Sequence, residues 1–265
     1  MTPSRETPNA SRSSETNWFA VNKPNPQAAL RLFCFPYAGG NHTLFHNWSR
    51  HLPSTVELCA AQLPGRGSRL RERPFTSLPP LVESLGQAIV PLSEKPFAFF
   101  GHSMGASIAF ELARYLRRER GVSPQHLFVS GRRAPQVPKD EPPIYNLPQD
   151  EFIEELRRLD GTPTEVLEHP ELMALMTPLL RADFSIVDTY EYTPDAPLDC
   201  GITAYGGLQD NEVSREKLEA WREQTRGRFT LRMLPGGHFF LQSEQQALLR
   251  SLHTELHQVV LEASS

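Results

Sequence analysis

The sequence has no hydrophobic run that could cross a membrane. No stretch of its 265 residues approaches the roughly 18 consecutive apolar residues of a membrane-spanning helix. The opening segment MTPSRETPNASRSSET is polar and lacks the apolar centre of a secretory signal. Long runs of lysine and arginine are also missing, and the net charge is −4. We therefore expect a cytoplasmic protein that binds neither nucleic acid nor membranes.

Cysteine is scarce, with three residues in the whole chain. Cys34, Cys59 and Cys200 each lie in or beside an apolar, strand-like stretch, and no two have the C-x-x-C spacing of a zinc site or redox motif. Cysteines in such surroundings are typical of buried free thiols in a reducing compartment. The sequence therefore predicts neither a disulfide nor a metal site.

The N-terminal residues differ in composition from the remainder. Residues 1–17 are rich in proline, serine, threonine and asparagine. Because such a segment buries too little apolar surface to order itself, we predict a flexible tail and assign it no function. The length of the remaining segment, 18–265, suits a single domain.

Short apolar runs alternate with segments of helical periodicity. Between two of these runs, Ile108, Leu112 and Leu116 recur at helical spacing, and Gly121 marks the expected end of that helix. This alternation predicts an α/β fold with a mainly parallel central sheet and helices on both faces. In such sheets, sites gather at the carboxyl ends of the strands. The predicted strands are residues 30–35, 56–62, 97–101, 126–131, 202–207 and 229–234.

One long interval, between the strand ending at Gly131 and the strand near Ile202, breaks the alternation. Within it, segments 149–161 and 170–190 carry apolar residues at helical spacing, with proline-rich joints around them. We interpret residues 135–190, approximately, as a helical lid over a pocket. The alternative is that these helices cover the core and do not move.

A glycine-flanked serine follows the strand at 97–101. The pattern G-x-S-x-G is weak alone, but here the sequence GHSMG joins a strand to a helix, which is the context of a nucleophile elbow. Gly101 and Gly105 leave room for the tight, strained turn that such an elbow requires. We therefore predict Ser103 as a nucleophile. An idle serine in a flexible turn is the alternative.

A serine nucleophile requires a base and a carboxylate that orients the base, in the chain order Ser, acid, His. Of nine histidines, His238 alone combines a glycine-rich loop, a position directly after a late strand and this order. A histidine with a structural role is the alternative. Asp210 follows the strand at 202–207 and is the predicted acid. Glu212, two residues further on, could take the same role, but Asp210 lies nearer the strand end.

An oxyanion hole would complete the site. Its N–H groups come from the residue after the nucleophile and from a loop after an early strand. Met104 is the first predicted donor. The loop PYAGG at 36–40 supplies the second, with Ala38 as its predicted donor. Hydrolysis by these residues needs neither a metal nor a cofactor, and we expect none.

With these residues in hand, the sequence resembles the type II thioesterases, stand-alone α/β-hydrolases that accompany polyketide and non-ribosomal peptide synthetases. The resemblance covers nearly all of the chain after the N-terminal tail. Tyr37 stands where the family commonly has histidine. The matching segments are LFCFPYAGG, LPGRGSR, FGHSMGA, LDGTP, LRADF, GLQDNEV and PGGHFFL.

The resemblance implies the α/β-hydrolase fold and hydrolysis of acyl groups from the phosphopantetheine arm of carrier proteins, which clears stalled or wrongly loaded arms. A general acyl-CoA thioesterase or carboxylesterase would use the same triad and is the alternative function. A hydrolase fold kept only as a binding module would be expected to have a damaged triad. We expect the protein to be a monomer.

Four arginines follow the strand at 56–62. We interpret them as a docking site for an acidic carrier domain or for the phosphate of its arm. Ordinary solvated surface is the alternative reading. They are Arg66, Arg69, Arg71 and Arg73.

Overall fold

A computed structural model describes residues 18–263, and the tail predicted at 1–17 lies outside these described residues. The chain forms a seven-stranded sheet in the order β1-β3-β2-β4-β5-β6-β7, in which only the pair β1–β3 is antiparallel. The strands are β1 (Phe19–Ala20), β2 (Leu30–Phe35), β3 (Val56–Ala61), β4 (Phe97–His102), β5 (His126–Ser130), β6 (Gly201–Gly207) and β7 (Phe229–Leu234).

Strands β2 to β7 correspond to the six strands predicted from sequence, and the mainly parallel α/β sheet is confirmed. The short strand β1 was not predicted. Its two residues pair with Ala60 and Ala61 of β3, and two residues are too few to give a periodic pattern.

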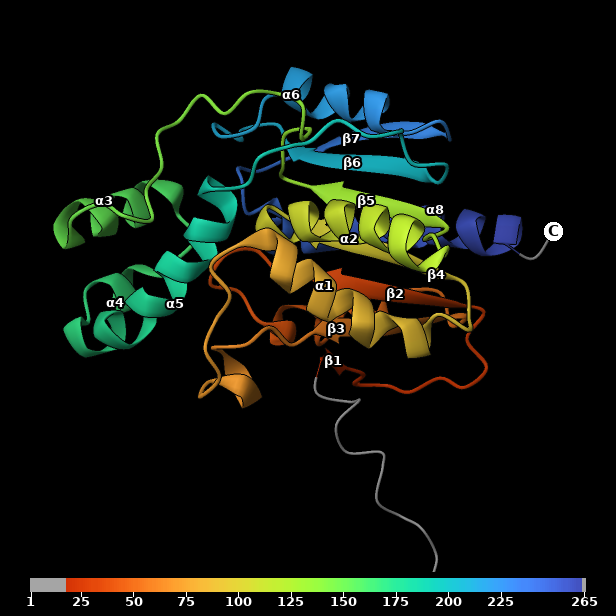
Figure 1. Cartoon of the computed structure of the whole chain (residues 1–265), viewed down its shortest axis with the longest axis horizontal. Coiled ribbons are helices and arrows are strands. Elements are labelled where there is room, and N and C mark those ends of the chain that lie inside the picture. The colour runs from red at the N-terminus through yellow and green to blue at the C-terminus, as the bar shows by residue number, and fades with distance from the viewer. Residues whose placement is uncertain (1–17, 264–265) are drawn as a thin grey trace, which may run out of the picture.

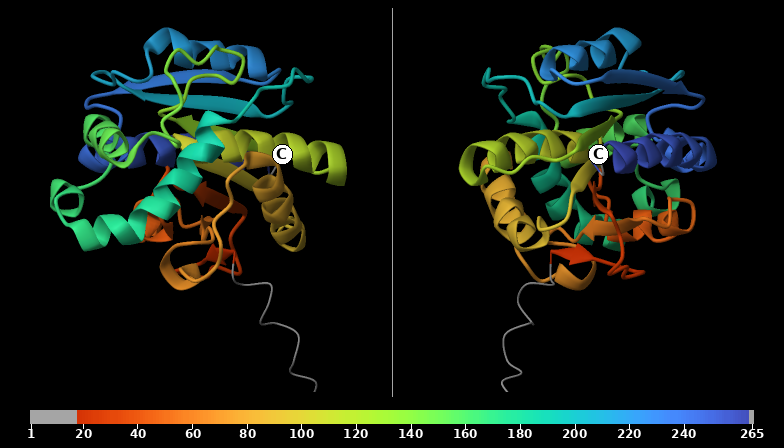
Figure 2. Two further views of the ribbon diagram at one scale, coloured as in Figure 1. Left: turned by 60° about the vertical axis from the view of Figure 1, so that its left-hand side comes forward. Right: turned by 90° about the vertical axis from the view of Figure 1, so that its right-hand side faces the viewer.

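Helices cover both faces of the sheet. Helices α1 (Leu78–Ile89) and α2 (Met104–Arg120) lie on one face, and α8 (Gln245–Ala263) lies on the other (Figure 2, right). Successive residues of β2 point to opposite faces, so that Phe33 joins the core beneath α1 and α2 while Leu32 joins the core beneath α8. Burial on both faces explains why β2 is an apolar run without alternation.

The predicted helix after Ser103 is α2. Its residues Ile108, Leu112 and Leu116 are fully buried, as their spacing indicated. The helix ends at Gly121, whose φ of 65° lies in the left-handed region that glycine adopts without strain. Helix α2 thus starts at the candidate nucleophile and is held along its length by the core.

The interval between β5 and β6 is helical, as predicted. It contains α3 (Gln149–Leu159), α4 (Thr164–Leu167) and α5 (Pro170–Asp188), which lie beyond the carboxyl ends of the parallel strands (Figure 1). The short helix α4 was not anticipated. Five buried residues give this helical insertion a small core of its own: Phe152, Leu156, Leu167, Met173 and Leu180.

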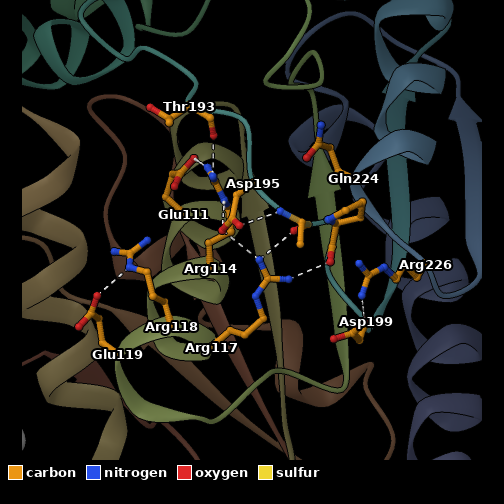
Figure 3. A network of polar contacts seen from close by, with 12 residues as sticks. Glu111, Arg114, Arg117, Arg118, Glu119, Thr193, Asp195, Asp199, Gln224 and Arg226 are labelled. Atoms are coloured by element: carbon orange, nitrogen blue, oxygen red, sulfur yellow. Dashed lines mark hydrogen bonds and ion pairs between the residues drawn. The ribbon is translucent and has the colours of Figure 1, made fainter.

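The chain returns from α5 to β6 along α2, where two arginines hold it (Figure 3). Arg114 Nη2 donates to the carbonyl oxygen of Thr193 at 2.6 Å. Arg117 donates to the carbonyl oxygen of Pro197 at 2.8 Å and to the carboxylate of Asp195 at 3.1 Å. The insertion is therefore anchored at its C-terminal end to a helix that packs on the sheet.

Short helices complete the described chain. They are α6 (Arg215–Glu219), α7 (Phe240–Ser243) and the 3-10 helices η1 (His42–Phe45), η2 (Trp48–Arg50), η3 (Gly67–Arg69), η4 (Val90–Leu92) and η5 (Ala220–Gln224). Among residues 18–263, no helix combines the length and apolar composition of a membrane span.

All three cysteines carry free thiols, as the sequence predicts. Cys34 and Cys59 are buried, and Cys200 is partly exposed. Burial, with a smaller contribution from Glu57, raises the pKa of Cys59 to about 12. This thiol therefore stays protonated at neutral pH and packs as a small apolar side chain.

Candidate active site

Ser103 occupies the turn between β4 and α2 with φ of 52° and ψ of −114°. Only it and Asp160 have positive φ among the non-glycine residues at 18–263. Backbone strain of this kind costs about 1–3 kcal/mol and is concentrated at functional sites. The Ser103 N–H donates to the carbonyl oxygen of Ser130 at 2.8 Å, which ties the turn to the end of β5.

The two flanking glycines are required by close backbone contacts. A Cβ on Gly101 would lie 2.0 Å from the carbonyl oxygen of Gly105. A Cβ on Gly105 would lie 2.1 Å from the carbonyl oxygen of Phe35 in β2. Because both contacts involve backbone, neither can be relieved by a rotamer change. The turn therefore has the geometry that the sequence predicted for a nucleophile elbow.

His238 and Asp210 are in contact at the carboxyl ends of β7 and β6. His238 Nδ1 lies 3.0 Å from Asp210 Oδ2, and the Asp210 side chain is completely buried. The loops that carry them pack closely, since the N–H of Gly236 donates to Gln209 Oε1 at 2.6 Å. With Nδ1 engaged by the carboxylate, Nε2 is the nitrogen left to accept a proton.

The second oxygen of Asp210 also has partners. Oδ1 accepts hydrogen bonds from the N–H groups of Glu212, at 2.8 Å, and Val213, at 3.1 Å. Glu212 itself pairs with Arg158 Nη1 at 2.6 Å. Asp210, rather than Glu212, therefore contacts the imidazole.

Ser103 and His238 line one cavity, which opens to solvent. Tyr37 and Ala38 of the loop after β2 also line it. The helical insertion provides an apolar wall through Leu156, Leu159, Leu180, Phe184 and Val187. The candidate nucleophile, base and oxyanion donor thus face the same space, at the carboxyl ends of the strands.

Of the N–H groups of Ala38, Gly39 and Gly40, only that of Ala38 has no acceptor among the described residues. The Gly39 N–H donates to Asp183 Oδ2 at 2.7 Å, and the Gly40 N–H donates to the carbonyl oxygen of Tyr37 at 2.9 Å. Within the described chain, the N–H groups of Ala38 and of Met104, the first residue of α2, have no acceptor. Both are available to a developing oxyanion.

His102, which the sequence analysis did not single out, lies beside this site. Its ring centroid is 5.2 Å from that of His238, and its Nδ1 lies 2.9 Å from Ser130 Oγ. Complete burial, reinforced by the neighbouring His238, lowers the pKa of His102 well below its ordinary value. His102 is therefore neutral, and the imidazole of His238 has no charged histidine beside it. The position directly before Ser103 was the available signal.

The arginine docking site predicted at 66–73 is wrong for two of its four members. Arg66 and Arg69 are both only 7% exposed. Arg66 forms an ion pair with Asp183, and Arg69 stacks over Trp18 at 4.1 Å while its guanidinium pairs with Glu72. Arg71 and Arg73 are exposed.

Arg132 and Arg133 also line the cavity, although the sequence analysis did not single them out. Arg132 is 9% exposed, and its guanidinium donates no hydrogen bond to any residue in the range 18–263. Burial, with the neighbouring Arg133, lowers the pKa of Arg132 to about 10, so the side chain is still a cation at neutral pH. A position directly after the strand at 126–131 was the signal that could have found it.

The chain is similar to known proteins in both sequence and structure. Residues 30–256 match the family model described as Thioesterase domain. The chain is 48% identical over 248 residues to the gramicidin S biosynthesis protein GrsT of Aneurinibacillus migulanus, covering 94% of this chain and 97% of that protein.

Two solved structures are similar over almost the whole chain. The type II thioesterase BorB from the borrelidin biosynthetic cluster has a TM-score of 0.81 at 36% identity, covering 92% of this chain and 97% of BorB. YbtT, a type II thioesterase from the yersiniabactin NRPS/PKS biosynthetic pathway, also has a TM-score of 0.81, at 30% identity, covering 94% and 100%.

Proposed function

Because the chain belongs to the type II thioesterases of non-ribosomal peptide and polyketide synthetase systems, we propose that it hydrolyses acyl thioesters with a triad of Ser103, His238 and Asp210. The observation that supports the triad most directly is the 3.0 Å contact between His238 Nδ1 and Asp210 Oδ2, in a cavity shared by His238 and the strained Ser103. In such a triad the carboxylate fixes the tautomer of the imidazole.

The first half of the reaction acylates the enzyme. Ser103 Oγ attacks the thioester carbonyl carbon while His238 Nε2 takes the hydroxyl proton. The N–H groups of Ala38 and Met104 stabilise the oxyanion of the tetrahedral intermediate. When the intermediate collapses, the C–S bond breaks and the imidazolium returns the proton to the departing thiol.

The second half releases the acyl group. His238 takes a proton from a water molecule, whose oxygen attacks the carbonyl carbon of the acyl-serine. The ester bond to Ser103 Oγ then breaks, the imidazolium protonates that oxygen, and the carboxylic acid leaves. Asp210 remains ionised throughout and stabilises each imidazolium.

We propose that the physiological thioesters are acyl groups on the phosphopantetheine arm of carrier proteins. Support comes from the relatives, which are biosynthetic thioesterases, and from the cavity, which combines an apolar wall with an opening to solvent. Arg71 and Arg73 are the two exposed members of the arginine group and remain candidates for contact with an acidic carrier.

The test compares hydrolysis of one acyl group on a carrier protein, on coenzyme A and as a simple ester. The wild-type protein should have the highest kcat/KM with the carrier. Ser103→Ala should lower the rate by several orders of magnitude while the fold is kept, and Ser84→Ala, at a half-buried position of α1 outside the cavity, is the matched control. Equal or greater efficiency on the simple ester would favour the carboxylesterase alternative.

A further inference from the structure

A buried ion pair connects the helical insertion to the loop after β3. Arg66 Nη1 and Nη2 lie 2.7 Å from Asp183 Oδ2 and Oδ1, respectively, so the contact is bidentate. Asp183, near the C-terminal end of α5, is 1% exposed, and Arg66 is 7% exposed. A buried pair adds little net stability, because desolvation of both charges offsets their attraction. We therefore look for its role in the backbone segment that it holds in place.

Both members of the pair also hold the backbone of the loop at 36–40. Asp183 Oδ2 accepts the N–H of Gly39 at 2.7 Å, and Arg66 Nη1 donates to the carbonyl oxygen of Gly40 at 3.2 Å. Two consecutive residues of the loop are therefore fixed, one through its donor and one through its acceptor.

These contacts control the direction of the Ala38 N–H. Gly40, once fixed, donates its own N–H to the carbonyl oxygen of Tyr37 at 2.9 Å. The carbonyl of Tyr37 and the N–H of Ala38 belong to one peptide unit, which is planar. Fixing the carbonyl therefore fixes the N–H, and the chain of contacts runs from Asp183 and Arg66 to the free donor of Ala38.

Helix α5 also packs against this loop through apolar contacts. Gly39 has φ of +79°, and a Cβ there would lie 2.6 Å from Cδ2 of Leu180, one turn before Asp183. The neighbouring Leu179 packs against the loop after β3, where its Cδ1 would lie 3.2 Å from a Cβ built on Gly65. The loop geometry therefore depends on α5 being seated against it.

We propose that Asp183 and Arg66 are positioning residues for the oxyanion hole, and that the hole is complete only while α5 is seated on the loop at 36–40. The inference rests on the proposed function, since it requires the Ala38 N–H as an oxyanion donor. An acyl thioester bound while α5 is displaced is then not turned over. Closure of the insertion and acyl transfer are coupled through one carboxylate.

The test measures kcat per active site in two variants, with active sites counted by fluorophosphonate titration. Asp183→Asn keeps the shape of the side chain. Arg66→Met combined with Asp183→Leu removes both charges and keeps an apolar filling, which spares the fold the cost of one unpaired buried charge. Both should lose about 10- to 100-fold in kcat with KM changed less than about threefold, since loss of a whole oxyanion donor costs about 10²–10³-fold.

Glu57→Gln is the matched control, because Glu57 makes the same kind of bridge far from the cavity. Its carboxylate accepts hydrogen bonds from Arg31 Nε at 2.8 Å and from the N–H of Asn25 at 2.7 Å, near the amino ends of β2 and β3. This variant should lose thermal stability but keep wild-type kcat per titrated site. A role that is merely structural would lower the number of titratable sites in all variants and leave kcat per site unchanged.

Amide hydrogen exchange in the wild-type protein tests the coupling between Gly39 and α5 without any variant. The Gly39 amide should exchange at the rate of the α5 amides, because both open together. A Gly39 amide far more protected than α5, or an unchanged kcat per site in folded Asp183→Asn, would overturn the positioning role alone. A wild-type protein inactive on every acyl thioester would instead overturn the proposed function, and this inference with it.

Discussion

The Cα of Gly105 faces the carbonyl oxygen of Phe35 so closely that an added Cβ would lie 2.1 Å from that oxygen. The contact brings the start of α2 against the end of β2, where the loop at 36–40 begins. It therefore packs the turn that carries Ser103 against the strand that leads into the loop of Ala38.

Gly105→Ala should destabilise the protein by more than about 3 kcal/mol, because the added Cβ would clash with backbone atoms of Phe35 and Pro36, which exceeds ordinary overpacking. Thermal and urea unfolding measure the loss. Gly121→Ala is the control, since Gly121 has φ of 65° and open space around its Cα, so that only the left-handed backbone conformation is penalised, by about 1 kcal/mol. Equal losses in the two variants would contradict the close contact at Gly105.

Asp210→Asn should lower kcat by roughly 10³- to 10⁴-fold, because an amide no longer holds the imidazole tautomer that the reaction needs. Glu212→Gln should remain within a few-fold of wild type, since Glu212 contacts Arg158 and not His238. Steady-state hydrolysis of an acyl-pantetheine substrate distinguishes them. The reverse ranking would assign the acid to Glu212.

The pH dependence of stability should reflect buried, neutral His126. Its Nε2 lies 2.9 Å from Thr203 Oγ1, and burial, with a smaller contribution from Arg228, lowers its pKa to about 3. Between about pH 6.5 and pH 3 the unfolded state binds a proton that the native state excludes, so the free energy of unfolding falls as the pH falls. The loss from this residue should reach roughly 2 kcal/mol at pH 5.

Urea unfolding at pH 7 and pH 5 measures this effect in wild type and in His126→Gln. The variant should lose less stability on acidification, although His102 acts in the same direction and preserves part of the slope. His257→Gln, at an exposed position on α8, should behave as wild type. A His126→Gln slope as steep as that of wild type would show that His126 is not excluded from protonation.

Carrier docking should depend on the exposed arginines. Arg71→Glu combined with Arg73→Glu should raise KM for an acyl-carrier substrate several-fold and leave a short acyl-pantetheine mimic unaffected, because only the carrier carries an extended acidic surface. Added salt should reduce the difference. Arg118→Glu, at an exposed position of α2, is the control for net charge. Equal changes on both substrates would remove the docking role.

Motion of the insertion should be uneven. Helix α5 is held by the buried Asp183 and by the arginine contacts to the segment after it, whereas α3 and α4 are held by the insertion's own small core and by the partly exposed pair of Arg158 with Glu212. Amide exchange should therefore be faster in α3 and α4 than in α5, and slowest in the sheet. Uniformly slow exchange, with and without an acyl group on Ser103, would support the static cover that the sequence left open.

Much of the fold followed from local patterns. The strands β2 to β7 are apolar runs bounded by turn residues, and α2 has a regular apolar face, so short-range periodicity was sufficient. The chain order of Ser103, Asp210 and His238 also predicted residues that lie near one another: His238 contacts Asp210 and lines the same cavity as Ser103. Strand β1 was missed because its pairing with β3 depends on tertiary contact and not on its own pattern.

The arginines mark the limit of this reasoning. A local sequence cannot distinguish Arg66, whose partner Asp183 is 117 residues away, from exposed Arg71 five residues later. Burial of a charge requires a partner that folding brings from a distant segment, and one sequence does not reveal that pairing. His102 and Arg132 each had a positional signal, beside Ser103 and directly after a strand, but their burial and the pKa shifts that follow from it depend on segments packed around them in the fold.

The core of the helical insertion is separate from the two cores that hold the sheet. Leu156 belongs to this core and also lines the cavity, so substitutions in the core should alter the apolar wall of the cavity and leave the packing beneath Ser103 unchanged. We therefore expect acyl-chain preference to change through substitutions in the helical insertion, or through exchange of the whole insertion between relatives, while Ser103, Asp210 and His238 stay the same. The exchangeable segment should end before Asp183, because the carboxylate of this α5 residue binds both Arg66 and the N–H of Gly39 in the loop at 36–40.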